Sequence, residues 1–148
     1  MRLYIDVCCL NRPFDDQTQD RVHLEAEALM LILKHVESGE WQWCTSEVVN
    51  FEIQQTPNAE RRYEVQLLTR HARQQILIDT AITKRAEELK RLGFTTYDAL
   101  HLACAEAVSV EVLLTTDDAI LKRFRRETSK IKIPVQNPLE WLWERVKP

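Results

Sequence analysis

The chain contains very little glycine, with Gly39 and Gly93 as its only two among 148 residues. Two glycines and five prolines are too few for a flexible linker, and we find no low-complexity tract and no internal repeat. No apolar run is long enough to cross a bilayer, because the apolar stretch 29–33 ends at Lys34. The first residues, MRLYIDVCC, lack the apolar core of a signal peptide. We therefore expect a cytoplasmic protein with no membrane partner and one domain spanning residues 1–148.

Cysteine is also scarce, and its placement argues against disulfides and zinc. Cys8 and Cys9 are neighbours, whereas Cys44 and Cys104 stand far apart. This spacing does not fit a secreted disulfide framework and does not resemble a zinc site. We expect reduced, buried thiols. The formal net charge of −3 leaves nucleic acid open as a partner, because a local cationic stripe can act on a mildly acidic molecule.

Short apolar strands alternate with helices along the chain. Strands are predicted at residues 2–6, 41–45, 75–79, 111–116 and 132–137. Helical spacing of apolar residues is clearest over 21–38, and further helices are predicted to follow Ser46, residues 56–60, Asp79, Thr95 or Thr96, Asp118 and Asn137. This alternation predicts an α/β fold, a three-layer α/β/α sandwich with a central, mainly parallel sheet of four to five short strands.

The segment between the first strand and the first long helix reads as a loop. Residues 11–20, NRPFDDQTQD, are polar and turn-like. Pro13 is expected to keep Arg12 out of the helical conformation. Arg12 is a candidate phosphate clamp near the first strand end, although a salt bridge to Asp15, Asp16 or Asp20 is an equal alternative.

Acidic residues occur at positions where functional groups gather in parallel sheets. Asp6 ends the first predicted strand and Asp117 follows the fourth, so both are expected beyond the same edge of the sheet. Asp98 heads the nearly wholly apolar segment ALHLACAEA, where a carboxylate loses hydration and needs a partner. Glu52 lies between Phe51 and Ile53, at the edge of the predicted core.

Carboxylates that share a site repel each other, and a divalent cation relieves that repulsion. Mg²⁺ and Mn²⁺ prefer hard oxygen ligands, and such ions activate water and stabilise leaving oxygens in phosphodiester hydrolysis. Each acid also has an alternative role. Asp6 could bond backbone donors in the next turn, Asp98 could interact with the helix dipole, and Glu52 could be a solvated helix residue. Asp117 could be a helix N-cap, with Asp118 as the competing fourth acid.

Four blocks, YIDVCCL, TSEVVNFEI, TTYDALHLACA and LLTTDDAIL, together resemble the PIN-domain ribonucleases, a family that includes the toxin halves of VapC-type toxin–antitoxin pairs. The resemblance extends from Arg2 to the NPLEWL segment. It implies Mg²⁺ or Mn²⁺, an RNA substrate, frequent homodimers and, for toxin members, a small antitoxin protein that covers the acidic pocket. It also implies that the catalytic and metal-binding residues are Asp6, Glu52, Asp98 and Asp117.

The chain departs from this family beside its first aspartate. Many members carry Ser or Thr there, whereas this chain has Val7, Cys8 and Cys9. Asn11 is a candidate for the place of that hydroxyl. Further candidates behind the metal ligands are Thr116 and Asp118.

Other polar residues have both functional and structural interpretations. His101 lies one turn after Asp98 and could bind metal or move protons, although its apolar flanks favour a core histidine held by hydrogen bonds. A cationic stripe that begins after Asp117 could contact an RNA backbone or could be a solvated helix face. Its main candidates are Lys122, Arg123 and Arg126.

The sequence thus predicts a divalent-metal-dependent endoribonuclease, with the toxin of a type II toxin–antitoxin pair as one form of it. The alternative is a non-catalytic RNA- or protein-binding module on the same fold.

Overall fold

A computed structural model describes all residues, 1–148. The strands are β1 (Arg2–Ile5), β2 (Gln42–Ser46), β3 (Gln74–Ile76), β4 (Val112–Leu114) and β5 (Val135–Gln136). The helices are α1 (Val7–Asn11), α2 (Asp20–Glu37), α3 (Glu47–Gln54), α4 (Ala59–Leu68), α5 (Thr80–Arg91), α6 (Thr96–Ala107), α7 (Asp118–Arg126) and α8 (Pro138–Val146). Short 3₁₀ turns lie at η1 (Arg12–Phe14), η2 (Thr69–His71) and η3 (Thr128–Lys130).

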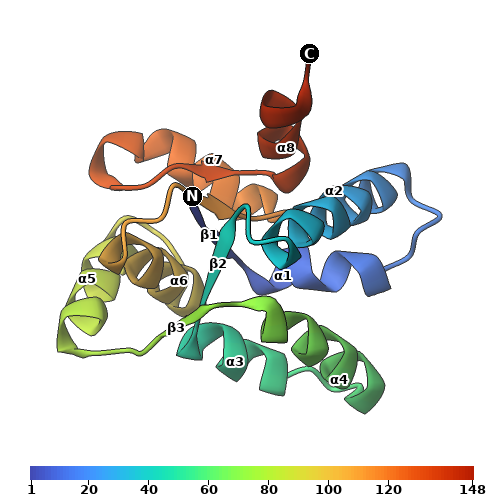
Figure 1. The fold of residues 1–148 in the computed structure, drawn as a ribbon. Coiled ribbons are helices and arrows are strands. Elements are labelled where there is room, and N and C mark those ends of the chain that lie inside the picture. The colour runs from blue at the N-terminus through green and yellow to red at the C-terminus, as the bar shows by residue number, and fades with distance from the viewer.

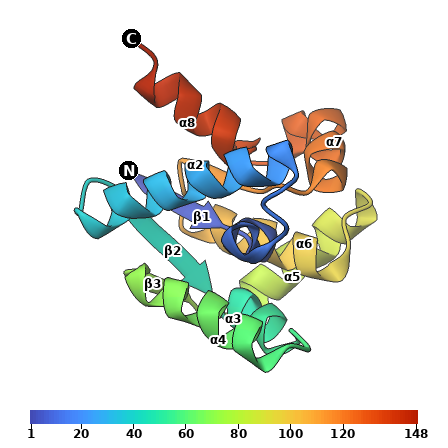
Figure 2. The ribbon, with the colours of Figure 1, turned by 90° about the vertical axis from the view of Figure 1, so that its right-hand side faces the viewer.

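The five strands form one parallel sheet in the order β3-β2-β1-β4-β5. Ile5 is in register with Leu114, and the backbone N–H of Asp6 donates to the Leu114 carbonyl at 3.1 Å, so β1 and β4 end side by side. Helices α2 and α8 lie on one side of the strands and α5 and α6 on the other (Figure 1). The view turned by 90° shows α8 above α2, with the two helices inclined to each other (Figure 2). The predicted three-layer sandwich with a parallel sheet is confirmed.

Local capping explains where most helices begin. The Ser46 hydroxyl accepts from the Val49 N–H at the start of α3, and the Thr95 hydroxyl accepts from the Asp98 N–H at the start of α6. Asn137 caps α8, which has proline at its first position, where a missing N–H costs nothing. Each of these caps was predicted, with Thr95 chosen over Thr96.

The predicted loop at residues 11–20 is wrong over its first residues, because Asn11 ends a helix and Arg12–Phe14 form η1. Val7–Asn11 form α1, whose N-cap is Asp6, and Arg12 has helical dihedral angles of φ −52° and ψ −41°. Pro13 lies in the first turn of η1. Because the first N–H groups of a helical turn have no intrahelical acceptor, proline is accommodated there and the chain remains coiled through Phe14.

The core is one continuous cluster of 39 buried apolar residues around the sheet. Its largest fully buried side chains include Trp43 and Trp141, whereas Trp143 is 58% exposed on α8. All four cysteines are free, and three of them are buried. None of the helices combines the length and apolar character needed to span a membrane.

Candidate active site

Asp6 lies at the carboxyl end of the central strand β1 and is only 4% exposed. Its Oδ1 accepts a hydrogen bond from the Cys9 N–H at 3.1 Å, so Asp6 does bond the backbone of the following turn. The Cys8 thiol donates to the same oxygen at 2.8 Å. Burial, followed by the neighbouring Cys8, holds the pKa of Asp6 well above its ordinary value. A buried carboxyl group in this position would gain from a nearby cation.

Cys8 links the ends of β1 and β4. Its sulfur lies 3.4 Å from the Thr115 hydroxyl, which in turn accepts from the Asp117 N–H at 3.1 Å. Sequence reasoning noted Cys8 only as a departure from the family pattern and did not identify Thr115. The pairing of β1 with β4, which no local pattern specifies, brings these residues together.

Asp117 and its neighbour Asp118 have different surroundings. Asp117 Oδ1 caps α7 by accepting from the N–H groups of Ala119 at 2.8 Å and Ile120 at 3.4 Å, as the alternative interpretation foresaw. Asp118 instead forms a two-point pair with Arg21 at 2.7 and 2.8 Å, and this guanidinium lowers the pKa of Asp118. Of these two neighbouring acids, it is Asp117 whose negative charge raises the pKa of Asp98.

Asp98 lies in the first turn of α6 and is partly buried. Burial raises the pKa of Asp98, and the negative charges of Asp117 and Glu52 raise it further, against the opposing effect of His101. The charges of Asp117 and Glu52 therefore act on Asp98, although the three residues come from separate segments of the chain.

Glu52, on α3, contacts the buried side chain of His101 on α6. The Nε2 atom of His101 hydrogen-bonds to Glu52 Oε1. Nδ1 of the same ring lies 2.6 Å from the Tyr4 hydroxyl, which lies 2.7 Å from the Ser46 hydroxyl. His101 is 3% exposed, so it is a core histidine held by hydrogen bonds, as its apolar flanks favoured. Its partners could not be identified from the sequence, since Tyr4 and Glu52 are distant along the chain.

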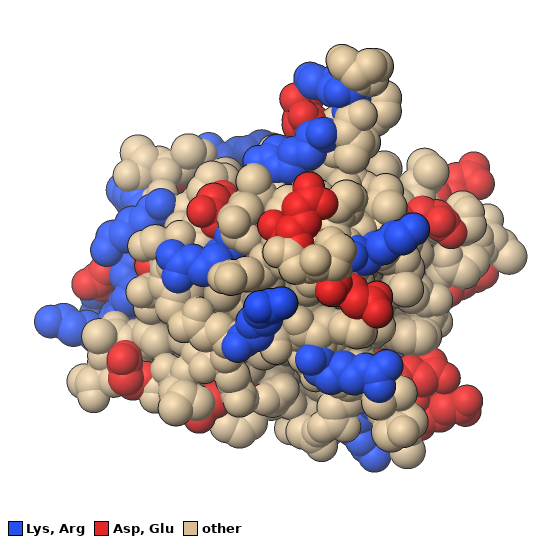
Figure 3. All heavy atoms as spheres, in the orientation of Figure 1, with Lys and Arg blue, Asp and Glu red and all other residues tan.

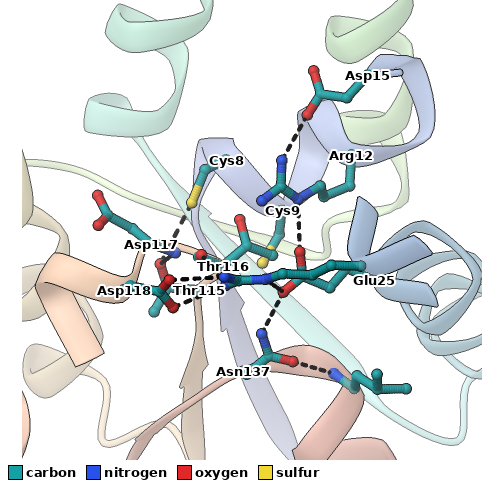
Figure 4. A network of polar contacts seen from close by, with 12 residues as sticks. Cys8, Cys9, Arg12, Asp15, Glu25, Thr115, Thr116, Asp117, Asp118 and Asn137 are labelled. Carbon is teal, nitrogen blue, oxygen red and sulfur yellow. Dashed lines mark hydrogen bonds and ion pairs between the residues drawn. The ribbon is translucent and has the colours of Figure 1, made fainter. Parts of the chain in front are cut away.

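A second polar network lies beside the candidate site (Figure 4). Its centre is Glu25, which is 1% exposed and accepts from Arg12 at 2.8 Å, from Arg21 at 3.2 Å and from the Asn137 amide. Arg12 also pairs with Asp15 at 3.0 Å, one of the salt bridges expected as an alternative to phosphate binding. Sequence reasoning missed Glu25, because a glutamate on a long helix gives no local signal of burial.

Asn11 and Thr116, the other residues predicted to support the candidate metal-binding acids, bond to the backbone or to arginines. The Asn11 amide donates to the Val7 carbonyl at 2.9 Å, and its oxygen accepts from Arg61 at 3.2 Å. Thr116 is buried, and its carbonyl accepts from Arg21 at 3.2 Å. Both residues therefore support the backbone around the strand ends.

The basic helix α7 begins directly after Asp117. Lys122 and Arg126 are exposed, whereas Arg123 is partly buried against Gly93. In the space-filling view, acidic and basic atoms are interspersed, and basic atoms are more frequent on the side where α5 and α7 lie (Figure 3). The basic residues of α7 therefore form a small cationic area and, in the view of Figure 3, are not part of a basic face that extends across the molecule.

The acids provide a donor set suited to a hydrated divalent ion. No group of three or more His, Cys, Asp or Glu side chains is arranged closely enough to hold a metal. Mg²⁺, however, keeps several waters and takes one or two carboxylates. Asp6 and Asp117 follow adjacent parallel strands, and Asp98 is repelled by two further acids. Hard oxygen donors and mutual repulsion fit Mg²⁺ or Mn²⁺ rather than a soft metal.

Comparisons with known proteins agree with this architecture. The family model described as the PIN domain matches residues 3–127. A search among curated proteins gives no match. Among solved structures, VapBC2 from Rickettsia felis bound to a DNA fragment from its promoter has a TM-score of 0.57 and 15% identity, covering 93% of this chain and 98% of that chain. FitAB bound to the IR36 DNA fragment has a TM-score of 0.54 and 17% identity, covering 93% and 95%. At these identities the two structures are evidence for the fold.

Proposed function

Because this chain belongs to the PIN-domain family, we propose that it is a divalent-metal-dependent endoribonuclease whose catalytic acids are Asp6, Glu52, Asp98 and Asp117. One observation carries the proposal. Asp6 and Asp117 follow the adjacent parallel strands β1 and β4, and the charges of Asp117 and Glu52 raise the pKa of Asp98, which supports a site shared by these acids.

Each acid has a defined task in this mechanism. Asp6, Glu52, Asp98 and Asp117 would hold Mg²⁺ or Mn²⁺, which would supply activation of water and stabilisation of charge on the leaving oxygen. Asp6 is oriented by the Cys9 N–H and Asp117 by the Ala119 N–H, so each is fixed before an ion arrives. Asp98 and Glu52 complete the hard donor set from α6 and α3. Helix α7 follows Asp117 and is the proposed RNA backbone contact, through Lys122, Arg123 and Arg126. Arg12 is a weaker candidate because Glu25 and Asp15 hold its guanidinium.

The titles of the two similar structures extend the proposal to partners. VapBC2 and FitAB are each described as bound to DNA. We propose that this chain is the toxin of a type II pair, that a small antitoxin covers its acids, and that it forms a homodimer. An open reading frame for a small DNA-binding protein directly beside the gene would support the toxin assignment.

The test is cleavage of a varied RNA panel with Mn²⁺. Asp6→Asn, Asp98→Asn and Asp117→Asn should each lower the rate by about a hundredfold or more, because each removes part of the ion's binding site. Asp118→Asn should keep most of the activity, since Arg21 occupies the Asp118 carboxylate. The exposed Asp16→Asn is the control.

The alternative is a binding module without catalysis, and the capping bonds of Asp6 and Asp117 favour it. Wild-type protein that binds RNA but cuts none of the panel with Mn²⁺ present would establish this alternative.

A further inference from the structure

A hydrogen-bonded chain of buried groups leads from the core to Glu52. It begins at the Ser46 hydroxyl, passes 2.7 Å to the Tyr4 hydroxyl and 2.6 Å to His101 Nδ1, and ends where Nε2 contacts Glu52 Oε1. Ser46 and Tyr4 are fully buried and His101 is 3% exposed, whereas the Glu52 side chain is 27% exposed. The chain thus connects the rigid centre of the sheet with an acid at the rim of the candidate site.

When Glu52 is ionised, the groups in this series can all donate in only one direction, from Ser46 towards Glu52. A carboxylate only accepts, so Nε2 of His101 must carry the hydrogen in that contact. In the neutral ring Nδ1 then accepts, and the Tyr4 hydroxyl is its donor. Burial raises the pKa of Tyr4, so this hydroxyl keeps its proton. The Ser46 hydroxyl can supply the next hydrogen to Tyr4 while its oxygen accepts from the Val49 N–H.

The reverse direction has a cost. If Tyr4 donated to Ser46 and Nδ1 of His101 donated to Tyr4, a lone pair on Nε2 would face an ionised Glu52. Two acceptors at hydrogen-bond distance in a partly buried place repel each other and leave both unsatisfied. The ionised Glu52 therefore selects the Nε2–H tautomer of His101, and the Tyr4 hydroxyl then satisfies Nδ1 as its donor.

We propose that His101 is a positioning residue that donates through its Nε2–H to Glu52, with its Nδ1 held by the Tyr4 hydroxyl, and that it presents Glu52 to a divalent cation. The inference depends on the proposed function only in naming Glu52 as a metal ligand. A ligand whose orientation is fixed in advance loses less side-chain freedom when the ion binds, and partners behind metal ligands tune metal affinity in this way. The buried ring does not touch the ion, so its contribution is to orient the glutamate.

The tautomer is tested directly by ¹⁵N NMR of the imidazole rings without metal. His101 is distinguished from His23, His35 and His71 by comparing wild type with His101→Gln. Wild type should show an Nε2–H ring at His101, and Glu52→Gln, whose amide can donate as well as accept, should lose that single tautomer, while the exposed Tyr97→Phe should not. An Nδ1–H ring or a doubly protonated ring in wild type would overturn the proposal.

Metal affinity is the second readout, measured as Mn²⁺ binding by EPR. Tyr4→Phe and His101→Leu should weaken binding by about tenfold, and His101→Gln, which keeps a side-chain N–H donor, should recover part of the loss. Circular dichroism and thermal melts identify folded variants before comparison. Equal loss in His101→Gln and His101→Leu, or no loss in either, would overturn the positioning role.

These readouts separate the inference from the proposed function. If the variants show the expected tautomer and Mn²⁺ effects but wild type cuts no RNA, the nuclease proposal fails and the positioning role stands. If wild type cuts RNA and both Tyr4→Phe and His101→Leu keep the wild-type metal affinity, the positioning role alone fails. Wild type that binds no Mn²⁺ would overturn both.

Discussion

Asp98 experiences two opposing influences at the residue scale. The backbone N–H of Asp98 donates to the Thr95 hydroxyl, which stabilises the start of α6. Burial and the charges of Asp117 and Glu52, in contrast, disfavour the ionised form of the Asp98 side chain. Without metal, the folded protein therefore binds a proton at Asp98 more readily than the unfolded chain does. Folding and ionisation are linked at this position.

This linkage predicts how stability depends on pH. The pKa of Asp98 is higher in the folded protein than in the unfolded chain. Its ionisation therefore does not destabilise the folded state below the unfolded pKa, near 3.9, and destabilises it increasingly as pH rises through the folded pKa. In EDTA, Asp98→Asn should therefore become more stable relative to wild type as pH increases from about 4 to 7. Urea unfolding at a series of pH values gives this difference in the free energy of unfolding.

Asp16 provides a control of opposite sign. Hydrogen bonds from Thr18 lower the pKa of the exposed Asp16, so its stabilising effect is present at neutral pH and is lost as pH falls. Asp16→Asn should therefore lose stability relative to wild type as pH rises. If Asp98→Asn followed the same direction as Asp16→Asn, Asp98 would be a structural acid with a favourable partner.

At the residue scale, the sequence predicts groups whose roles are local. Ser46, Thr95 and Asn137 were identified as helix caps because their partners lie two or three positions away. The contact between His101 and Tyr4 was not predictable, since it depends on how α6 packs against β1. Asp6 and Asp117 could be assigned to one sheet edge only because parallel strands end together.

At the scale of elements, Glu25 joins four segments. It binds Arg12 of η1, Arg21 on its own helix α2 and Asn137 before α8, and Arg21 also pairs with Asp118 at the start of α7. Salt bridges between exposed groups contribute little, but removing one member of a buried network leaves its partners uncompensated. The network therefore ties the elements on one side of the candidate site to each other.

Glu25→Ala should lower the free energy of unfolding by about 3 kcal/mol, because it leaves two guanidinium groups and an amide without their shared acceptor. Glu27→Ala on the same helix is the matched control, since the Glu27 side chain is 72% exposed, and it should change stability by less than about 0.5 kcal/mol. Urea unfolding measures both. Equal effects of the two substitutions would show that Glu25 adds nothing beyond an ordinary surface pair.

Gly93 sets the path between α5 and α6. Its φ of +106° is strained for other residues, and a Cβ there would lie 2.8 Å from Arg123 Cζ. Gly39 has φ +85°, but a Cβ there would approach no atom closer than 3.7 Å. Gly39→Ala should thus cost about 1 kcal/mol and Gly93→Ala more.

In Gly93→Ala, the clash between the new Cβ and the Arg123 side chain can be measured separately from the backbone strain. In an Arg123→Ala background, the cost of Gly93→Ala should fall towards that of Gly39→Ala, since only the backbone strain remains. Urea unfolding of the single and double variants provides this cycle. An unchanged cost in the double variant would show that the Arg123 side chain moves aside freely.

At the scale of the whole molecule, the net charge of −3 opposes RNA at long range, while α7 presents cations locally. The Debye length is about 8 Å at physiological ionic strength, so charges farther away are largely screened. The fold places α7 directly after the strand that precedes Asp117, and a strand of RNA bound there would approach the acids. Local cations, rather than net charge, should therefore determine affinity.

Binding of single-stranded RNA in EDTA tests this argument, because the proposed metal-dependent cleavage should not occur during the measurement. Lys122→Ala and Arg126→Ala should each weaken binding at low salt and reduce the slope of log affinity against log salt concentration by about 0.7, the contribution of one phosphate contact. Lys34→Ala removes the same charge from the exposed face of α2 and should leave the slope unchanged. If all three variants reduced the slope equally, RNA would respond to overall charge, and α7 would be only a solvated helix face.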